Sequence, residues 1–389
     1  MWGYEGRDVS TGVHDPLYAT VLILTSSEAK VAIVSWDVCE FQSPWLRKQV
    51  GELGIPHLLL CSTHTHGGPD LLQADFPSAE KPLLRIVEER ILGAIREAQA
   101  GAFPAYISAG AGSIQLGYNR IQRDREGLGI TWFENPERIP FGPVDPTVGV
   151  IRIKDNTGRI RAVLVHYACH AVVLGPENRL ISADYPGATT KAVEEAIGPG
   201  AYCMFIQGAS GDINPLFLAR SPDVDQNFAM VDKMGRTLAG EVTETLERMD
   251  KAPGKSESLR AACDTIVVPN RWDKEKKLTL GVASVLLNAE IGIVSLPGES
   301  FIELQRTLRA RAELPYTFLF GCTDNSYQDW PDYYLPDIQS AAHAGYGASD
   351  STEAGLGAGE QLVNAGLIQL FTMRGMFRDK PWRPPAKSF

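Results

Sequence analysis

The sequence has no C-x-x-C pair, although it contains six cysteines: Cys39, Cys61, Cys169, Cys203, Cys263 and Cys322. Most of them lie in apolar runs, which is typical of buried free thiols in a reducing compartment and argues against a disulfide framework. The first residues also lack the basic-then-apolar pattern of a secretory signal. On these grounds we expect a cytoplasmic protein.

Long basic runs and long apolar runs are missing as well. The formal net charge of −10 and the pI near 5.3 argue against nucleic acid or an anionic membrane as the main partner. The longest apolar stretch, residues 278–296, is interrupted by Asn288, Glu290 and Gly292. It therefore predicts two strands joined by a turn, and no integral membrane segment. We find no internal repeat.

Apolar segments of strand length alternate with segments of helical spacing along the chain. Strands are predicted at 18–24, 29–38, 55–61, 106–111, 148–153, 160–165, 202–207, 283–287, 291–296 and 317–321, and helices at 44–53, 79–99, 186–197, 226–249, 301–313 and 353–373. This order predicts an α/β fold, a mixed and largely buried β-sheet with helices on both faces. We expect one domain over residues 1–377 and a Pro-rich tail at 378–389, with 252–258 the best linker candidate.

Two histidines follow the apolar run 58–61, in the sequence Ser62-Thr-His64-Thr-His66-Gly-Gly-Pro69. Side chains alternate along an extended chain, so we expect the imidazoles of His64 and His66 to point the same way. Strand ends are where α/β proteins usually bind ligands, and imidazole is both a common metal ligand and a common acid or base. A pair of surface histidines beside a turn is the alternative.

Four further segments place polar residues directly after apolar strands: 163–170 with His166 and His170, 182–187 with Asp184, 206–215 with Asp212 and Asn214, and 295–299 with Glu299. Each has a structural explanation when taken alone, such as a helix N-cap for Asp184 or a helix start for Glu299. Together with the histidine pair they supply imidazole and carboxylate groups. That is the donor set of a catalytic zinc site with one open position.

The same segments resemble the neutral/alkaline non-lysosomal ceramidase family, and specifically its short prokaryotic relatives that have only the N-terminal catalytic domain. The matching pieces are His14-Asp15-Pro16-Leu17-Tyr18-Ala19, Ser62–Pro69, Tyr118-Asn119-Arg120, Val144-Asp145-Pro146, Ala168-Cys-His170, Ser182–Gly187, Gln207–Pro215 and Leu296-Pro297-Gly298-Glu299. They run in the family's order from near residue 3 to about residue 373. The resemblance implies a ceramidase-like fold and a zinc-dependent hydrolase that cleaves a carboxylic amide or ester.

Position by position, the resemblance implies a single Zn²⁺ held by four groups: His64, His170, Glu299 and Tyr334. The tyrosine is chosen because Tyr334-Leu-Pro336, with Tyr346 twelve residues later, matches the family's spacing. Tyr333 and Tyr327 are weaker candidates for the same place. The resemblance also maps a second histidine onto His66 and a substrate-facing arginine onto Arg120.

Asn214 occupies the position at which ceramidases proper carry a serine, often assigned as the nucleophile. An amide cannot act as a nucleophile, although it can donate hydrogen bonds to an oxyanion. We therefore predict attack by metal-activated water, with His66 moving the proton and with Arg120 and Asn214 holding the substrate carbonyl or a distal carboxylate. We expect three carboxylates to fix the histidine tautomers, namely Asp37, Asp184 and Asp212. His14 either joins them or is a buried structural histidine.

The expected partner is a small-molecule acyl amide or ester. Ceramide itself is one option, but the long ceramidases have an extra C-terminal domain, whereas this chain ends soon after the last predicted helix and starts late relative to the family. Two other classes stay open. A two-metal phosphoesterase would combine the histidine pair with bridging aspartates and hold metals about 3.5–4 Å apart. A non-catalytic relative would keep one metal as a structural element.

Overall fold

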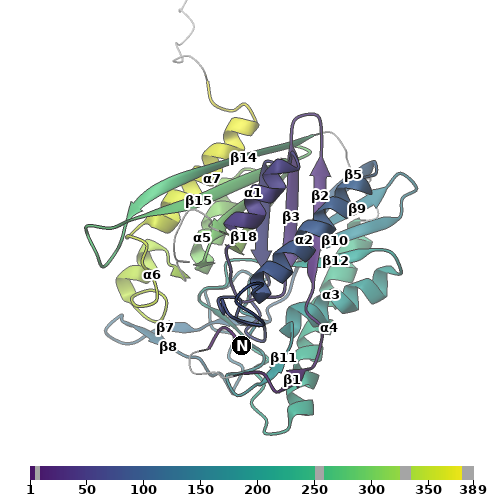
Figure 1. The fold of residues 1–389 in the computed structure, drawn as a ribbon. Helices are drawn as coiled ribbons and strands as arrows, with labels where there is room; N and C mark the ends of the chain where they lie inside the picture. Colours follow the sequence, from purple (N-terminus) through teal and green to yellow (C-terminus); the bar gives the residue numbers. More distant parts are fainter. Residues whose placement is uncertain (5–8, 250–257, 325–333, 379–389) are drawn as a thin grey trace, which may run out of the picture.

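The computed structural model describes residues 1–4, 9–249, 258–324 and 334–378, and in them two β-sheets carry the architecture (Figure 1). The larger sheet has the strand order β14 (Leu259–Pro269), β15 (Lys277–Leu287), β16 (Ile291–Pro297), β18 (Tyr316–Thr323), β4 (His57–Ser62), β3 (Lys30–Trp36) and β2 (Ala19–Thr25). The smaller has the order β12 (Tyr202–Gln207), β10 (Ile160–Tyr167), β9 (Thr147–Asp155) and β5 (Ala105–Ser113). Both sheets contain parallel and antiparallel pairs.

The two sheets pack face to face, and alternate residues of their strands point into the shared core. Ile33 and Leu59 of the larger sheet share one buried cluster with Ile151 and Leu164 of the smaller sheet. Their neighbours on the opposite face, such as Leu60, pack against helices. Strands buried on both faces are apolar at nearly every position, which is why they are readily recognised in the sequence.

Helices cover the outer faces of both sheets. The larger sheet is covered by α1 (Pro44–Glu52) and α2 (Leu83–Ala100) over β2–β4, and by α5 (Ile302–Arg311) and α7 (Ala358–Met373) over β15–β18 (Figure 1). The smaller sheet is covered by α3 (Asp184–Ile197) and α4 (Val224–Met249). The predicted α/β fold with helices on both faces is thereby confirmed, and the core consists of two stacked sheets.

Short ladders between distant segments complete the fold. They are β1 (Gly12–Val13) with β11 (Leu180–Ile181), β6 (Gly117–Asn119) with β13 (Ile213–Pro215), β7 (Ile121–Arg123) with β8 (Gly129–Thr131), and β17 (Glu299–Ser300) with β19 (Tyr334–Leu335). A short helix, α6 (Ile338–His343), follows β19. The ladders β6–β13 and β17–β19 carry residues predicted for the site, so they position side chains that lie far apart in the sequence.

Several predictions concern regions at the margin of the described residues. The linker candidate 252–258 and the tail 378–389 lie almost entirely outside them, so the extent of the domain stays a prediction.

All six cysteines are free and five of them are buried, as the sequence predicts. Within the part of the chain that the structure describes, every helix is too short or too polar to cross a bilayer.

Candidate metal-binding active site

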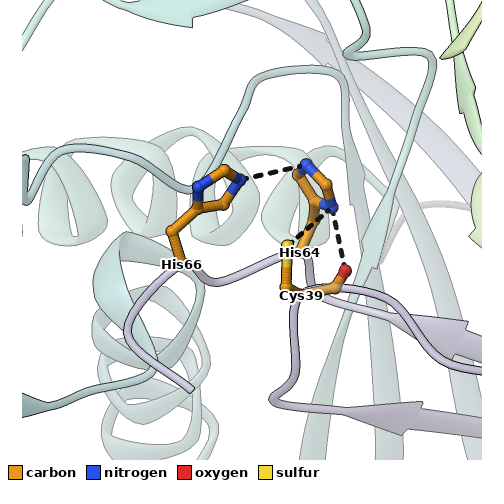
Figure 2. A group of neighbouring side chains, drawn as sticks. All are labelled: Cys39, His64 and His66. Atoms are coloured by element: carbon orange, nitrogen blue, oxygen red, sulfur yellow. Dashed lines mark hydrogen bonds between the residues drawn. The ribbon is translucent and has the colours of Figure 1, made fainter. Parts of the chain in front are cut away.

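His64 and His66 lie just beyond the end of β4, and their imidazoles converge. Their Nε2 atoms are 3.3 Å apart (Figure 2). We predicted this convergence from the alternation of side chains along an extended strand. That reason is wrong, because His64 has a φ of +65° and is not in an extended strand. A left-handed conformation is unfavourable for a residue with a Cβ, and such strain is concentrated at functional sites.

His170 and Glu299 arrive at the same point from other parts of the fold. His170 follows β10, and its Nε2 lies 2.7 Å from Oε2 of Glu299, which opens the short strand β17. The same Oε2 lies 3.3 Å from Nε2 of His64, and all three side chains are buried. The structure thus brings three of the four predicted zinc ligands together as a group that could hold a metal ion. Their role as ligands stays a prediction.

The orientation of the two buried imidazoles is set by backbone carbonyls. Nδ1 of His64 donates to the carbonyl of Cys39 at 2.8 Å, and Nδ1 of His170 donates to the carbonyl of Ser210 at 2.6 Å. Each Nε2 is then the nitrogen with the free lone pair, which is the arrangement usual for metal-binding histidines.

Two buried atoms at this point also lack a conventional partner. Nε2 of His170 and Oε2 of Glu299 form no hydrogen bond of acceptable geometry among the described residues, although they are close to each other. Buried polar atoms are rarely left in this state. Together with Nε2 of His64, these two atoms fit the binding of one shared divalent cation. Imidazole nitrogen and carboxylate oxygen are both suitable ligands for zinc.

The three aspartates expected to fix the histidine tautomers do not do so, and this prediction is wrong. Asp37 accepts hydrogen bonds from the Tyr18 amide and the Thr63 hydroxyl. Asp184 accepts from the amides of Val173, Leu174 and Tyr185. Asp212 accepts from the Ile302 amide and the Asn119 side chain. His14 is also outside the site, since it is partly exposed and stacks on Phe228. Backbone carbonyls take the place of the predicted carboxylates.

The charges at this point favour binding of a cation. Burial alone would raise the pKa of Glu299, but His64 and His170 outweigh it and hold that pKa well below its ordinary value. Burial opposes protonation of His64, yet the adjacent Glu299 raises its pKa well above the ordinary value. Burial lowers the pKa of His170 to about 4. A divalent cation would bind the neutral imidazole of His64 at Nε2, in competition with a proton at that nitrogen, so metal binding by this group is expected to depend on pH.

Cys39 lies next to His64, and together with His66 they form a second group that could hold a metal (Figure 2). Its Sγ is 3.8 Å from Nδ1 of His64, the nitrogen that already donates to the Cys39 carbonyl. Burial raises the pKa of the Cys39 thiol, whereas metal binding requires the thiolate. We therefore assign Cys39 the role of orienting His64 through its backbone carbonyl, and not that of a metal ligand. Sequence reasoning missed this contact because nothing in the local pattern around Cys39 indicates it.

Arg120, Asn214 and Tyr334 form the other half of the site. The guanidinium of Arg120 donates to the Tyr334 hydroxyl at 3.0 Å, to the Gly211 carbonyl at 2.7 Å and to Oδ1 of Asn214 at 3.2 Å. Tyr334 pairs in register with Glu299 in the β17–β19 ladder, so the main chain places the two side by side. The alternatives for the fourth ligand, Tyr327 and Tyr333, lie outside the described residues.

Gly211 provides a test of how tightly these segments pack. A Cβ at this position would overlap the backbone oxygen of Glu299, which is not on a flexible side chain. We expect Gly211→Ala to lower the free energy of unfolding by about 1–3 kcal/mol and to weaken metal binding, because the strand that carries Glu299 must shift. Urea denaturation and metal titration measure the two effects.

The matched control for Gly211→Ala is Gly93→Ala in α2, where a Cβ would meet nothing within 4 Å. That exchange should raise the free energy of unfolding by about 0.5–1 kcal/mol, since Ala favours helix more than Gly does. Equal stability changes in the two variants would contradict the close contact at Gly211.

A family model described as "Neutral/alkaline non-lysosomal ceramidase, N-terminal" matches residues 1–256. Among solved structures, the neutral ceramidase from Pseudomonas aeruginosa superposes with a TM-score of 0.74 at 14% identity, over 97% of this chain and 72% of that chain. A structure described as a ceramidase complexed with C2 gives a TM-score of 0.74 at 13% identity, over 99% of this chain and 74% of that chain. The family match and the shared fold confirm the resemblance found in the sequence, and the chain belongs to the neutral/alkaline non-lysosomal ceramidase family.

Proposed function

We propose that this member of a family of amide hydrolases is a zinc-dependent enzyme that cleaves a carboxylic amide or ester. The observation that carries the proposal is the convergence of His64, His170 and Glu299 from three separate segments, with both imidazoles oriented by backbone carbonyls. Tyr334, paired with Glu299, is the proposed fourth ligand. When bound there, zinc polarises a substrate carbonyl and lowers the pKa of a water molecule towards about 7.

His66 is the residue that we propose to move the proton. It is half-buried, whereas His64 and His170 are fully buried, and its Nε2 faces Nε2 of His64. An imidazole in this place can take the proton from the attacking water and deliver it to the leaving nitrogen or oxygen. The rings of Tyr4 and His66 pack in a T-shaped contact, with centroids 4.8 Å apart, which helps to hold the imidazole in place.

Arg120 is the residue that we propose to stabilise the negative charge on the substrate. Its side chain is buried and fixed by three acceptors, so its position needs no rearrangement during the reaction. Its Nε is buried and has no hydrogen-bond partner among the described residues. This N–H is the donor that we assign to the substrate carbonyl oxygen or to a distal carboxylate.

We expected Asn214 to hold the substrate directly, but its carboxamide is bonded to Arg120 and to the Phe133 carbonyl, so we propose instead that it acts through Arg120. Its Oδ1 accepts from the guanidinium, and its Nδ2 lies 3.4 Å from the carbonyl of Phe133. We expect Asn214→Ala to keep its zinc but to lower turnover by about 10²-fold, because the guanidinium loses one of its fixed acceptors. Steady-state kinetics and elemental analysis on the same sample measure both quantities.

Asn214→Asp is the companion variant. An aspartate keeps an acceptor oxygen for the guanidinium, but its charge offsets that of Arg120 and its second oxygen faces the Phe133 carbonyl, so we expect it to recover only part of the turnover. Unchanged turnover in Asn214→Ala would remove Asn214 from the proposed mechanism.

The substrate class that we propose is a small acyl amide or ester. A two-metal phosphoesterase is less well supported, because among the described residues the groups that could hold a metal contain a single carboxylate, Glu299. Buried free thiols support the proposed cytoplasmic setting.

Elemental analysis together with a panel of N-acyl amides and esters of varied chain length tests the proposal. One zinc per chain and hydrolysis of at least one acyl series are expected. Two metals per chain would favour the phosphoesterase, and one zinc without any hydrolysis would favour the non-catalytic relative.

A further inference from the structure

Gln207, the last residue of β12, lies between the two segments that carry His64 and His170. Its Nε2 donates to the carbonyl of Cys169 at 2.9 Å and to the carbonyl of Thr63 at 3.3 Å, and its Oε1 accepts from the Cys169 amide at 3.3 Å. Cys169 and Thr63 directly precede the two histidines. One carboxamide therefore links the main chain of both segments immediately before the proposed ligands.

A second connection lies on the other side of the histidines. Thr65 and Ala171 form an isolated parallel bridge, in which the amide of His66 donates to the Ala171 carbonyl at 3.3 Å. Each histidine is thus held between a side-chain link before it and a main-chain link after it. The amides of His64 and His170 bond to other segments, at the carbonyls of Val38 and Ile213, so the link that joins the two histidine segments to each other before the histidines is the Gln207 side chain.

We propose that Gln207 is a positioning residue that sets the distance between His64 and His170 and thereby the affinity of the site for zinc. Its side chain is completely buried and uses both amide hydrogens and its oxygen in these bonds. Both amide hydrogens are used and the side chain is fully buried, so it is not placed to touch a substrate, which separates this role from a catalytic one. The proposal rests on the zinc site proposed above.

The expected effect follows from the geometry that zinc demands. Histidine nitrogens bind zinc at about 2.0–2.1 Å, so a shift of a few tenths of an ångström in one segment moves a ligand out of place. Loss of groups that orient metal ligands typically weakens metal binding by about 10- to 100-fold. We expect this loss in Gln207→Met, which keeps the length of the side chain but removes all three hydrogen bonds.

Gln207→Glu is a second variant, with the same shape but with acceptor oxygens facing the carbonyls of Thr63 and Cys169. If Gln207→Met does not fold, Gln207→Glu still tests the proposal. It is expected to weaken zinc binding to a similar degree. Chelator competition measures the zinc dissociation constant of each purified variant. The visible spectrum of the Co²⁺-loaded protein reports the ligand geometry without any need for turnover.

Gln305→Met is the matched control. Gln305 is as buried as Gln207, and it accepts from the Ala209 amide and donates to Asp145, but it bonds neither histidine segment. We expect both methionine variants to melt at lower temperature, and only Gln207→Met to bind zinc more weakly and to shift the Co²⁺ spectrum.

The outcomes separate this inference from the proposed function. Tight zinc binding by the wild-type chain together with unchanged binding by Gln207→Met and Gln207→Glu would overturn the positioning role alone. Equal weakening in Gln305→Met would also overturn it, because the effect would then follow from lost stability. A wild-type chain that binds no zinc would overturn the proposed function and this inference together.

Discussion

Replacing Glu299 by Gln is expected to remove the zinc and to lower activity by about 10³-fold or more. Oε2 of Glu299 faces the Nε2 atoms of both His64 and His170, and it supplies the negative charge of the group. Glutamine keeps the shape but loses this charge, and the contribution of a bound metal to hydrolysis is worth several kcal/mol, or about 10³-fold in rate. Elemental analysis and turnover at saturating substrate measure the two losses.

The control is Glu303→Gln, the same exchange four residues further along the chain. Glu303 is partly exposed and pairs with Arg306 on α5, so this variant should keep both zinc and activity. His64→Ala removes a second donor and should reproduce the double loss of Glu299→Gln. Full zinc content in either variant would contradict the proposed ligand set.

Replacing Arg120 by Met is expected to lower kcat by about 10²- to 10³-fold, because a preorganised donor to the developing oxyanion is lost. Zinc should still bind through His64, His170 and Glu299, although more weakly, because Tyr334 loses the hydrogen bond that orients it. The buried acceptors at Gly211, Asn214 and Tyr334 then lose their donor, so the free energy of unfolding should also fall, by about 1–3 kcal/mol for each unpaired group. Separate values of kcat and KM, measured with the zinc content, test the assignment.

Arg120→Lys tests whether charge alone suffices. Lysine keeps the positive charge but lacks the planar fork that reaches three acceptors, so we expect it to recover only part of the loss. Arg138→Met replaces an exposed arginine further along the chain; it is the control and should leave kcat unchanged. A kcat for Arg120→Met equal to that of wild type would remove Arg120 from the mechanism.

Most of the fold could be predicted from the sequence because its central strands are buried on both faces. The runs that became β3, β4 and β16 are apolar at nearly every position and were easily recognised. β14 was missed, since this edge strand is largely exposed and polar residues interrupt it. The short ladders were missed for another reason: a strand of two or three residues is too short to show periodicity, and its partner is set by the tertiary fold.

The candidate site was predictable in its residues and much less so in its geometry. His64, His170 and Glu299 each follow an apolar strand, which is a local signal. The left-handed backbone at His64 and the carbonyls that orient the imidazoles have no local signal, because they depend on segments that meet only in the folded chain. The same holds for Gln207, whose carboxamide reaches residue 63 from 144 positions away.

Anomalous X-ray scattering at the zinc absorption edge, from crystals of the zinc-loaded protein, tests the central claim most directly. The proposal predicts one peak per chain, about 2.0–2.2 Å from Nε2 of His64, Nε2 of His170 and a carboxylate oxygen of Glu299. A peak elsewhere, or two peaks about 3.5–4 Å apart, would contradict it.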